Sequence, residues 1–279
     1  MPTREQKIDI PVDSGPIEGT LVTPGSLIPG VLFVHGWGGS QQQYLARARE
    51  IAAHGCVCLT FDLGGHAGTQ PRRETVSRES NLRDVLAAYD TLTRHPHVDP
   101  GAIAVVGSSY GGYLAAILTS LRRVKWLALR VPALYIDAGW ELPKLQLHSD
   151  FDLHSYRRSV VPAASNRALR ACAEFEGDVL LVESEHDDII PHAVITSYRE
   201  ACVNSRSLTY RCMDDADHGL TDPASQLAYT ALLTQWLGEM LPRARRDGAS
   251  AAAAVAAATQ AEAAQPSAQR EPEAPPKAS

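Results

Sequence analysis

The sequence predicts an α/β protein built on a mostly parallel sheet with helices on both faces. Two observations predict this class. Short apolar runs, typical of strands buried on both faces, alternate along the chain with amphipathic segments of helical spacing. This repeated alternation favours parallel strands joined by helical crossovers.

The first half of the chain begins with two short strands, Lys7–Val12 and Gly19–Thr23, which we expect to form a hairpin as an antiparallel sheet edge. Gly30–His35 is a continuous apolar run and predicts a fully buried strand. The helix Gln41–His54 follows and is capped by Gly55. The next expected elements are a strand over Cys56–Asp62, a helix over Glu79–Thr93, a strand over Ala102–Val106 and a helix over Tyr110–Ser120.

The second half continues the alternation after an interruption. A strand is expected over Val124–Arg130, and residues 131–166 then combine bulky apolar residues with prolines and show no clean period. This length favours a partial cap over the sheet, although an irregular surface excursion is the alternative. The remaining expected elements are strands over Asp178–Glu183 and Ser207–Met213, and helices over His192–Cys202 and Ser225–Met240.

Two regions of different composition define the domains. Residues 1–242 are long enough for one large domain with a well-buried core. Residues 243–279 are rich in Ala, Gln, Glu and Pro and have almost no large apolar residues, so we expect a disordered tail. The tail is either a passive extension or a partner-binding segment.

Charge and cysteine content narrow the function classes. The net charge of -6 offers no basic field for nucleic acid. The five cysteines are scattered and odd in number, which indicates reduced thiols and a cytoplasmic protein. The first residues lack the apolar run of a signal peptide, and no segment approaches the length of a membrane span. We therefore expect no nucleic-acid partner and no membrane partner.

The most informative motif is Gly107-Ser108-Ser109-Tyr110-Gly111, which follows an apolar strand and opens a helix. Only Ser109 has a glycine two positions away on each side, which a sharp strand-to-helix turn requires. Serine needs a base and an orienting carboxylate to act as a nucleophile. Asp187 and His218 follow later buried strands. Reacting groups commonly lie at the carboxyl ends of parallel strands, where all three of these residues are expected.

These motifs resemble those of the α/β-hydrolase superfamily, and most closely its branch of small esterases similar to dienelactone hydrolases and acyl peptidases. The resemblance extends from about Ile8 to Leu241. It is carried by His35-Gly-Trp-Gly-Gly39, Gly107-x-Ser109-x-Gly111, His186-Asp187-Asp188-Ile-Ile-Pro191 and Asp217-His218-Gly219, in the family order. It implies the α/β-hydrolase fold with a short cap.

The resemblance also implies roles for individual residues. Ser109 is the expected nucleophile, His218 the base and Asp187 the acid, with Asp188 and Glu185 as weaker candidates for the acid. The backbone N–H groups of Trp37 and Tyr110 are expected to form the oxyanion hole. In similar loops the histidine, here His35, braces the glycines rather than acting as a base.

Several other residues are assigned only general roles. Trp37 is either a pocket wall or a packing residue, and Trp37, Tyr110 and Trp140 are expected to line a compact pocket. Gly64 stands where relatives often have arginine, so Asp62 and His66 are expected to be turn residues. No H-E-x-x-H or similar cluster occurs, and we expect no metal and no cofactor.

The sequence thus predicts a serine hydrolase that cleaves small to medium carboxylic esters. Peptidase or amidase, thioesterase and acyltransferase activities remain open because the same triad serves them. The alternative of another class is a non-catalytic protein that binds a small ligand. The sequence leaves the oligomeric state open, with an edge strand or the cap as surfaces for a homodimer.

Overall fold

The computed structural model describes residues 3–10, 17–24 and 27–241. The prediction of a disordered tail over 243–279 lies outside the described residues. In the described part of the chain, no helix is both long and apolar enough to span a membrane.

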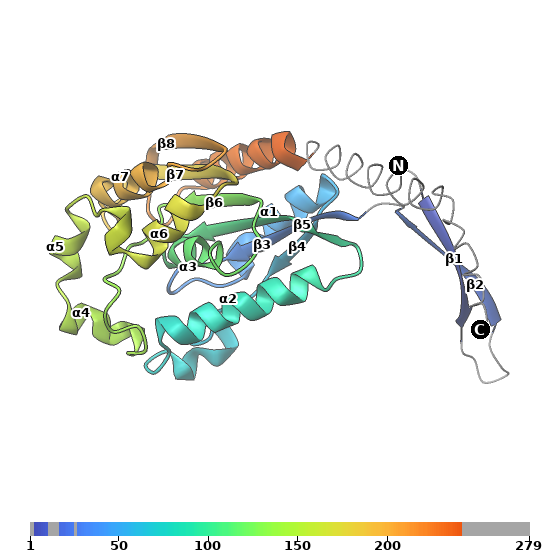
Figure 1. The fold of residues 1–279 in the computed structure, drawn as a ribbon, viewed down its shortest axis with the longest axis horizontal. Coiled ribbons are helices and arrows are strands. Elements are labelled where there is room, and N and C mark those ends of the chain that lie inside the picture. The colour runs from blue at the N-terminus through green and yellow to red at the C-terminus, as the bar shows by residue number, and fades with distance from the viewer. Residues whose placement is uncertain (1–2, 11–16, 25–26, 242–279) are drawn as a thin grey trace, which may run out of the picture. The chain divides into compact units, whose positions relative to one another are not determined.

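The strands form two separate sheets (Figure 1). β1 (Thr3–Ile10) and β2 (Ile17–Pro24) pair antiparallel, which confirms the expected hairpin. They form a two-stranded sheet of their own, so the expectation that the hairpin supplies an antiparallel edge of the central sheet is wrong. Among the described residues, β1 and β2 pair with each other, and the six strands of the central sheet pair only with one another.

The central sheet is entirely parallel, with the order β4-β3-β5-β6-β7-β8. The bounds of these strands are β3 (Ile28–Val34), β4 (Val57–Thr60), β5 (Val98–Ser108), β6 (Trp126–Arg130), β7 (Asp178–His186) and β8 (Ser207–Asp217). All six were expected from the sequence. β5 begins earlier than expected, and β7 and β8 extend further at their carboxyl ends, where polar residues continue the pairing.

Helices cover both faces of this sheet, as predicted. Leu32 and Val34 of β3 belong to a buried cluster with residues of α2 (Arg78–Thr93), α3 (Tyr110–Leu118), α6 (Arg167–Glu174) and α7 (His192–Ala201). Phe33 points to the opposite face, where its ring contacts Tyr44 of α1 (Gln42–Ala53). A further helix runs over residues 223–241.

The segment over residues 131–166 contains only short helices. They are η2 (Lys144–Gln146), α4 (Leu147–Asp150), α5 (Leu153–Arg157) and η3 (Ala163–Ser165). Figure 1 shows α4 and α5 at one end of the six-stranded sheet. Leu134, Leu147 and Leu153 are buried in the main core cluster, which anchors this segment to the rest of the fold.

Candidate active site

Ser109 occupies a strained turn between β5 and α3. Its φ of 52° and ψ of −119° place a non-glycine residue at positive φ, a conformation that costs about 1–3 kcal/mol and persists only where its surroundings enforce it. Besides the helical bond that its carbonyl accepts from the Tyr113 N–H, two backbone hydrogen bonds to other segments hold it. The Ser109 N–H donates to the Arg130 carbonyl at 2.9 Å, and the Ser109 carbonyl accepts from the Ala133 N–H at 2.9 Å.

The flanking glycines are required because the backbone is crowded around this turn. A Cβ on Gly111 would lie 2.2 Å from the Val34 carbonyl oxygen, and one on Gly107 would lie 2.6 Å from the Gly111 carbonyl oxygen. Neither contact is sterically tolerable, and both involve backbone atoms. This is the physical reason why Ser109, and not Ser108, occupies the apex of the turn, where it is only partly buried.

The structure brings Ser109, His218 and Asp187 into one chain of hydrogen bonds. The Ser109 Oγ lies 3.1 Å from His218 Nε2, and His218 Nδ1 lies 2.7 Å from Asp187 Oδ2. An ionised carboxylate only accepts hydrogen bonds, so the imidazole proton belongs on Nδ1. His218 Nε2 is then free to accept the Ser109 hydroxyl proton.

Both carboxylate oxygens of Asp187 are held by hydrogen bonds. Its second oxygen, Oδ1, accepts from the backbone N–H groups of Ile189 and Ile190 at 2.8 and 2.7 Å. The alternative acids lie elsewhere: Asp188 is exposed, and the Glu185 carboxylate accepts from the Asp215 N–H at 2.9 Å. Among the sequence-predicted acids, Asp187 is therefore the one that contacts His218.

The loop after β3 lies against Ser109. A Cβ on Gly36 would be 3.3 Å from the Ser109 Cβ, so the backbone of this loop is in contact with the Ser109 turn. The backbone hydrogen bonds of the described residues leave the Trp37 N–H without an acceptor. Tyr110 is the first residue of α3, where an N–H has no acceptor within the helix. Both N–H groups are thus available to a ligand.

His35 stabilises this loop through hydrogen bonds, as expected from the sequence. Its Nε2 accepts from the Leu63 N–H at 2.9 Å, so the proton resides on Nδ1, which lies 2.8 Å from the Gly36 carbonyl oxygen. Burial lowers the pKa of His35, which favours this neutral form. The His66 ring packs edge-on against the His35 ring, with 5.0 Å between the ring centres, and Asp62 Oδ1 accepts from the Gln41 N–H. His66 and Asp62 therefore have structural roles in this turn.

A cavity of about 190 Å³ opens beside Ser109 and His218. Trp37 lines it, while the rings of Tyr110 and Trp140 do not, so the expectation of a pocket formed by all three aromatics is wrong. Tyr110 is completely buried and donates to Asn81 Oδ1 at 3.1 Å. Trp140 lies instead under the guanidinium groups of Arg78 and Arg167.

Two buried cations near the site were not foreseen from the sequence. The Lys144 Nζ lies 4.2 Å from the centre of the Trp37 ring and 5.0 Å from that of Tyr110, and burial lowers its pKa. Arg130, at the end of β6, donates to the His218 carbonyl oxygen at 2.7 Å. A single lysine or arginine in sequence carries no signal of such a position, because only the tertiary fold creates it.

Metal-ligating side chains gather at one place in the described residues. Glu185, His186 and Asp215 have ligand atoms within 4.8 Å of one another, and all three are exposed. None of them contacts Ser109 or His218 in the hydrogen bonds above. The site around Ser109 brings together a serine hydroxyl, an imidazole nitrogen and backbone N–H groups, which are the kinds of group that acyl transfer requires.

Comparison with known proteins places this geometry in context. Residues 31–231 match the model of the alpha/beta hydrolase family. The quorum-quenching protein AidA of Acinetobacter baumannii is 33% identical over 87 residues, but this match covers only 30% of the chain and 28% of that protein. The chain thus spans less than a third of the length of this curated relative.

Solved structures share the fold at low identity. The dienelactone hydrolase of Anabaena variabilis superposes with a TM-score of 0.54 and 20% identity, covering 84% of this chain and 96% of that one. The esterase PF2001 of Pyrococcus furiosus gives a TM-score of 0.57 and 17% identity, covering 85% and 91%. These likenesses confirm the fold that the motifs predicted.

Proposed function

Because the chain belongs to the alpha/beta hydrolase family, we propose that it is a serine esterase acting on small to medium carboxylic esters. The observation that carries the proposal is the unbroken hydrogen-bond chain from Ser109 through His218 to Asp187. Its geometry meets the requirement for an activated serine, a base and an orienting carboxylate.

The mechanism follows from the positions of these atoms. Ser109 Oγ attacks the ester carbonyl carbon while His218 Nε2 takes the hydroxyl proton. Asp187 holds the imidazole in the tautomer that accepts this proton and stabilises the imidazolium that forms. His218 then protonates the departing alcohol oxygen, which leaves an acyl group on Ser109. A water molecule, deprotonated by His218, then attacks the carbonyl carbon of that acyl group. The bond from this carbon to Ser109 Oγ breaks, His218 returns the proton to Oγ, and the acid leaves.

The oxyanion of each tetrahedral intermediate is assigned to the N–H groups of Trp37 and Tyr110. Both are backbone donors held by neighbouring structure, one in the braced glycine loop and one at the start of α3. Fixed donors need no reorganisation as charge develops, which is why such sites lower the barrier. The cavity of about 190 Å³ favours a small or medium substrate.

The proposal is tested with a fluorophosphonate probe and p-nitrophenyl esters of increasing chain length. We expect the wild-type protein to be labelled and the Ser109→Ala variant to be inert, with turnover reduced by about 10⁶-fold. Ser120→Ala changes an exposed serine in the turn just after α3. It is the matched control and should retain labelling and turnover.

Two results would contradict the proposal. Undiminished turnover by Ser109→Ala would remove the assigned nucleophile. Absence of both labelling and turnover in the folded wild-type protein would favour the alternative of a ligand-binding protein with this fold. The chain-length profile then measures the acyl pocket of an active enzyme.

A further inference from the structure

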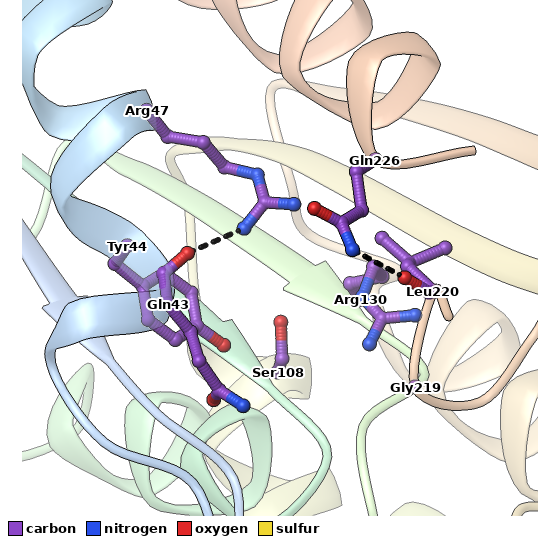
Figure 2. Close-up of a pocket in the computed structure, with 8 residues that line it drawn as sticks. All are labelled: Gln43, Tyr44, Arg47, Ser108, Arg130, Gly219, Leu220 and Gln226. Atoms are coloured by element: carbon purple, nitrogen blue, oxygen red, sulfur yellow. Dashed lines mark hydrogen bonds between the residues drawn. The ribbon is translucent and has the colours of Figure 1, made fainter. Parts of the chain in front are cut away.

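A second cavity, of about 150 Å³, adjoins the one that contains Ser109. Figure 2 shows the residues that line this second cavity. The two cavities share lining residues. These are Gln43, Tyr44, Ser108, Arg130 and Gly219. A molecule bound at Ser109 is therefore within reach of the second cavity. Neither cavity has an aspartate or glutamate among the described residues that line it.

Arg130 brings a positive charge to this cavity, where Asp187 and Asp217 interact with it electrostatically without pairing with it directly. Its side chain is 6% exposed, and it donates to the His218 carbonyl oxygen at 2.7 Å and to Ser184 Oγ at 3.3 Å. These bonds use two of the five N–H donors of a guanidinium. Within the described part of the chain, Arg130 forms no ion pair. A buried cation that no carboxylate contacts directly is costly, and an anionic ligand in contact with it offsets that cost.

Arg47 adds a second cation from the opposite wall. It donates to Thr230 Oγ1 and to the Gln43 carbonyl oxygen, each at 3.0 Å, which fixes its guanidinium. Arg47 and Arg130 lie 5.0 and 5.6 Å from the centre of the same ring, that of Tyr229. Figure 2 shows Arg47 reaching from α1 and Arg130 from the sheet toward the same space.

The positive charges of Arg47 and Arg130 repel each other, and an anion bound near both offsets this repulsion. Burial is the main cause that lowers the pKa of Arg130. Arg47 acts in the same direction, while Tyr44, Tyr229 and Asp187 partly oppose it. Gln226, whose amide donates to the Leu220 carbonyl oxygen at 2.9 Å, adds a further polar group to the lining. Planar guanidinium groups with spare donors match a carboxylate, which accepts two hydrogen bonds side by side.

We infer that the cavity between Arg47 and Arg130 binds a carboxylate of the substrate, so that the preferred esters carry a free carboxylate group. This inference rests on the proposed esterase function and specifies its substrate class. The ester carbonyl lies at Ser109, and the carboxylate enters the adjoining cavity.

The test compares each acidic ester with its neutral carboxamide, which has nearly the same shape. Monomethyl esters of dicarboxylic acids place the carboxylate on the acyl side, and acetoxy acids place it on the alcohol side. We expect kcat/KM to favour the acidic member of at least one series by roughly tenfold to a hundredfold, the effect of hydrogen bonds to a charged group. Added salt should reduce this preference.

Arg47→Gln should abolish the preference, so that the acidic and neutral esters of a pair react at similar kcat/KM. Arg49→Gln removes the same charge from an exposed position of the same helix and should retain the preference. Equal reactivity of acidic and neutral esters in the wild-type enzyme would overturn the inference, as would an unchanged preference in Arg47→Gln.

A binding measurement separates this inference from the esterase proposal. Glutarate is titrated calorimetrically into wild-type protein and into Arg47→Gln. Saturable binding that weakens at least tenfold in Arg47→Gln would support the carboxylate site even if no ester were hydrolysed. Ester hydrolysis without glutarate binding and without acidic preference would leave the esterase proposal standing and overturn the carboxylate site.

Discussion

The two carboxylate oxygens of Asp187 bind different partners. Oδ2 faces His218 at 2.7 Å, while Oδ1 accepts two backbone N–H groups from the turn that follows. The turn thereby fixes the rotation of the carboxylate, and the carboxylate in turn fixes the imidazole. One residue thus connects the local chain geometry after β7 to the proton position on His218.

Replacing Asp187 by Asn tests this link. The amide has nearly the same shape but no charge, and it no longer selects the imidazole tautomer whose Nε2 accepts the serine proton. We expect kcat to fall by about 10⁴-fold with the fold intact. Asp188→Asn, one position along, removes an equal charge from an exposed carboxylate and should leave kcat within about twofold. Comparable losses in both variants, measured with the same p-nitrophenyl ester, would contradict the assignment.

The sequence was sufficient to place Ser109, Asp187 and His218, because each follows a recognisable apolar strand. It was not sufficient for Lys144 and Arg130. Nothing around Lys144 predicts that its amine lies over the Trp37 ring, and nothing around Arg130 predicts a bond to the His218 carbonyl. Both contacts join segments remote in sequence, so their position depends on the assembled fold.

At the scale of single elements, the connection from β5 to α3 depends on close backbone contact. The turn is packed so tightly under the loop after β3 that glycine at 111 leaves no spare volume. By contrast, a Cβ on Gly238, in the helix over residues 223–241, would meet no atom within 4 Å. A methyl group would therefore collide with backbone atoms at Gly111 and would be accommodated freely at Gly238.

We expect Gly111→Ala to destabilise the protein by about 3 kcal/mol or more, because backbone atoms must move to admit the methyl group. Gly238→Ala should stabilise it by about 0.5–1 kcal/mol, the difference in helix propensity. Urea unfolding followed by circular dichroism measures both. An unchanged free energy of unfolding in Gly111→Ala would show that the turn relaxes at no cost.

Helices and strands with a strong apolar pattern were predicted from the sequence. A helix whose clearest signal was its N-terminal cap was not. α6 was missed, although Asn166 caps it by accepting from the N–H groups of Ala168 and Leu169 at 2.9 and 3.3 Å. The helix has only eight residues and follows an irregular segment, so its period did not stand out. An asparagine cap before a short amphipathic stretch was the available clue.

At the scale of the whole molecule, the parallel sheet is what makes the site. Ser109, Asp187 and His218 follow β5, β7 and β8, and only parallel strands bring these carboxyl ends to one edge. The alternation of strands and helices predicted a parallel sheet. It did not predict the order β4-β3-β5-β6-β7-β8, because the apolar pattern of a buried strand does not identify its neighbours.

Global stability should depend on pH through the buried histidines behind the site. His35 and His66 are 1% and 2% exposed, their rings are in contact, and burial lowers the pKa of both. In the unfolded chain their pKa returns to about 6.5. Below that pH, His35 and His66 bind protons in the unfolded state, whereas in the folded state they stay neutral until the pH reaches their lowered pKa. The free energy of unfolding therefore falls as the pH drops from about 6.5 toward the folded-state values, and the full contribution is present above 6.5.

Urea unfolding at pH 7.5, 6.5, 5.5 and 5.0 tests this dependence. We expect the wild-type protein to lose stability across this range, and the double variant His35→Gln, His66→Gln to lose less of its own, because glutamine does not titrate. Glutamine also retains an acceptor for the Leu63 N–H, so the loop after β3 keeps its brace. His154→Gln, on an exposed surface of α5, is the control and should follow the wild-type slope. Parallel slopes in wild type and double variant would assign the acid sensitivity to other groups.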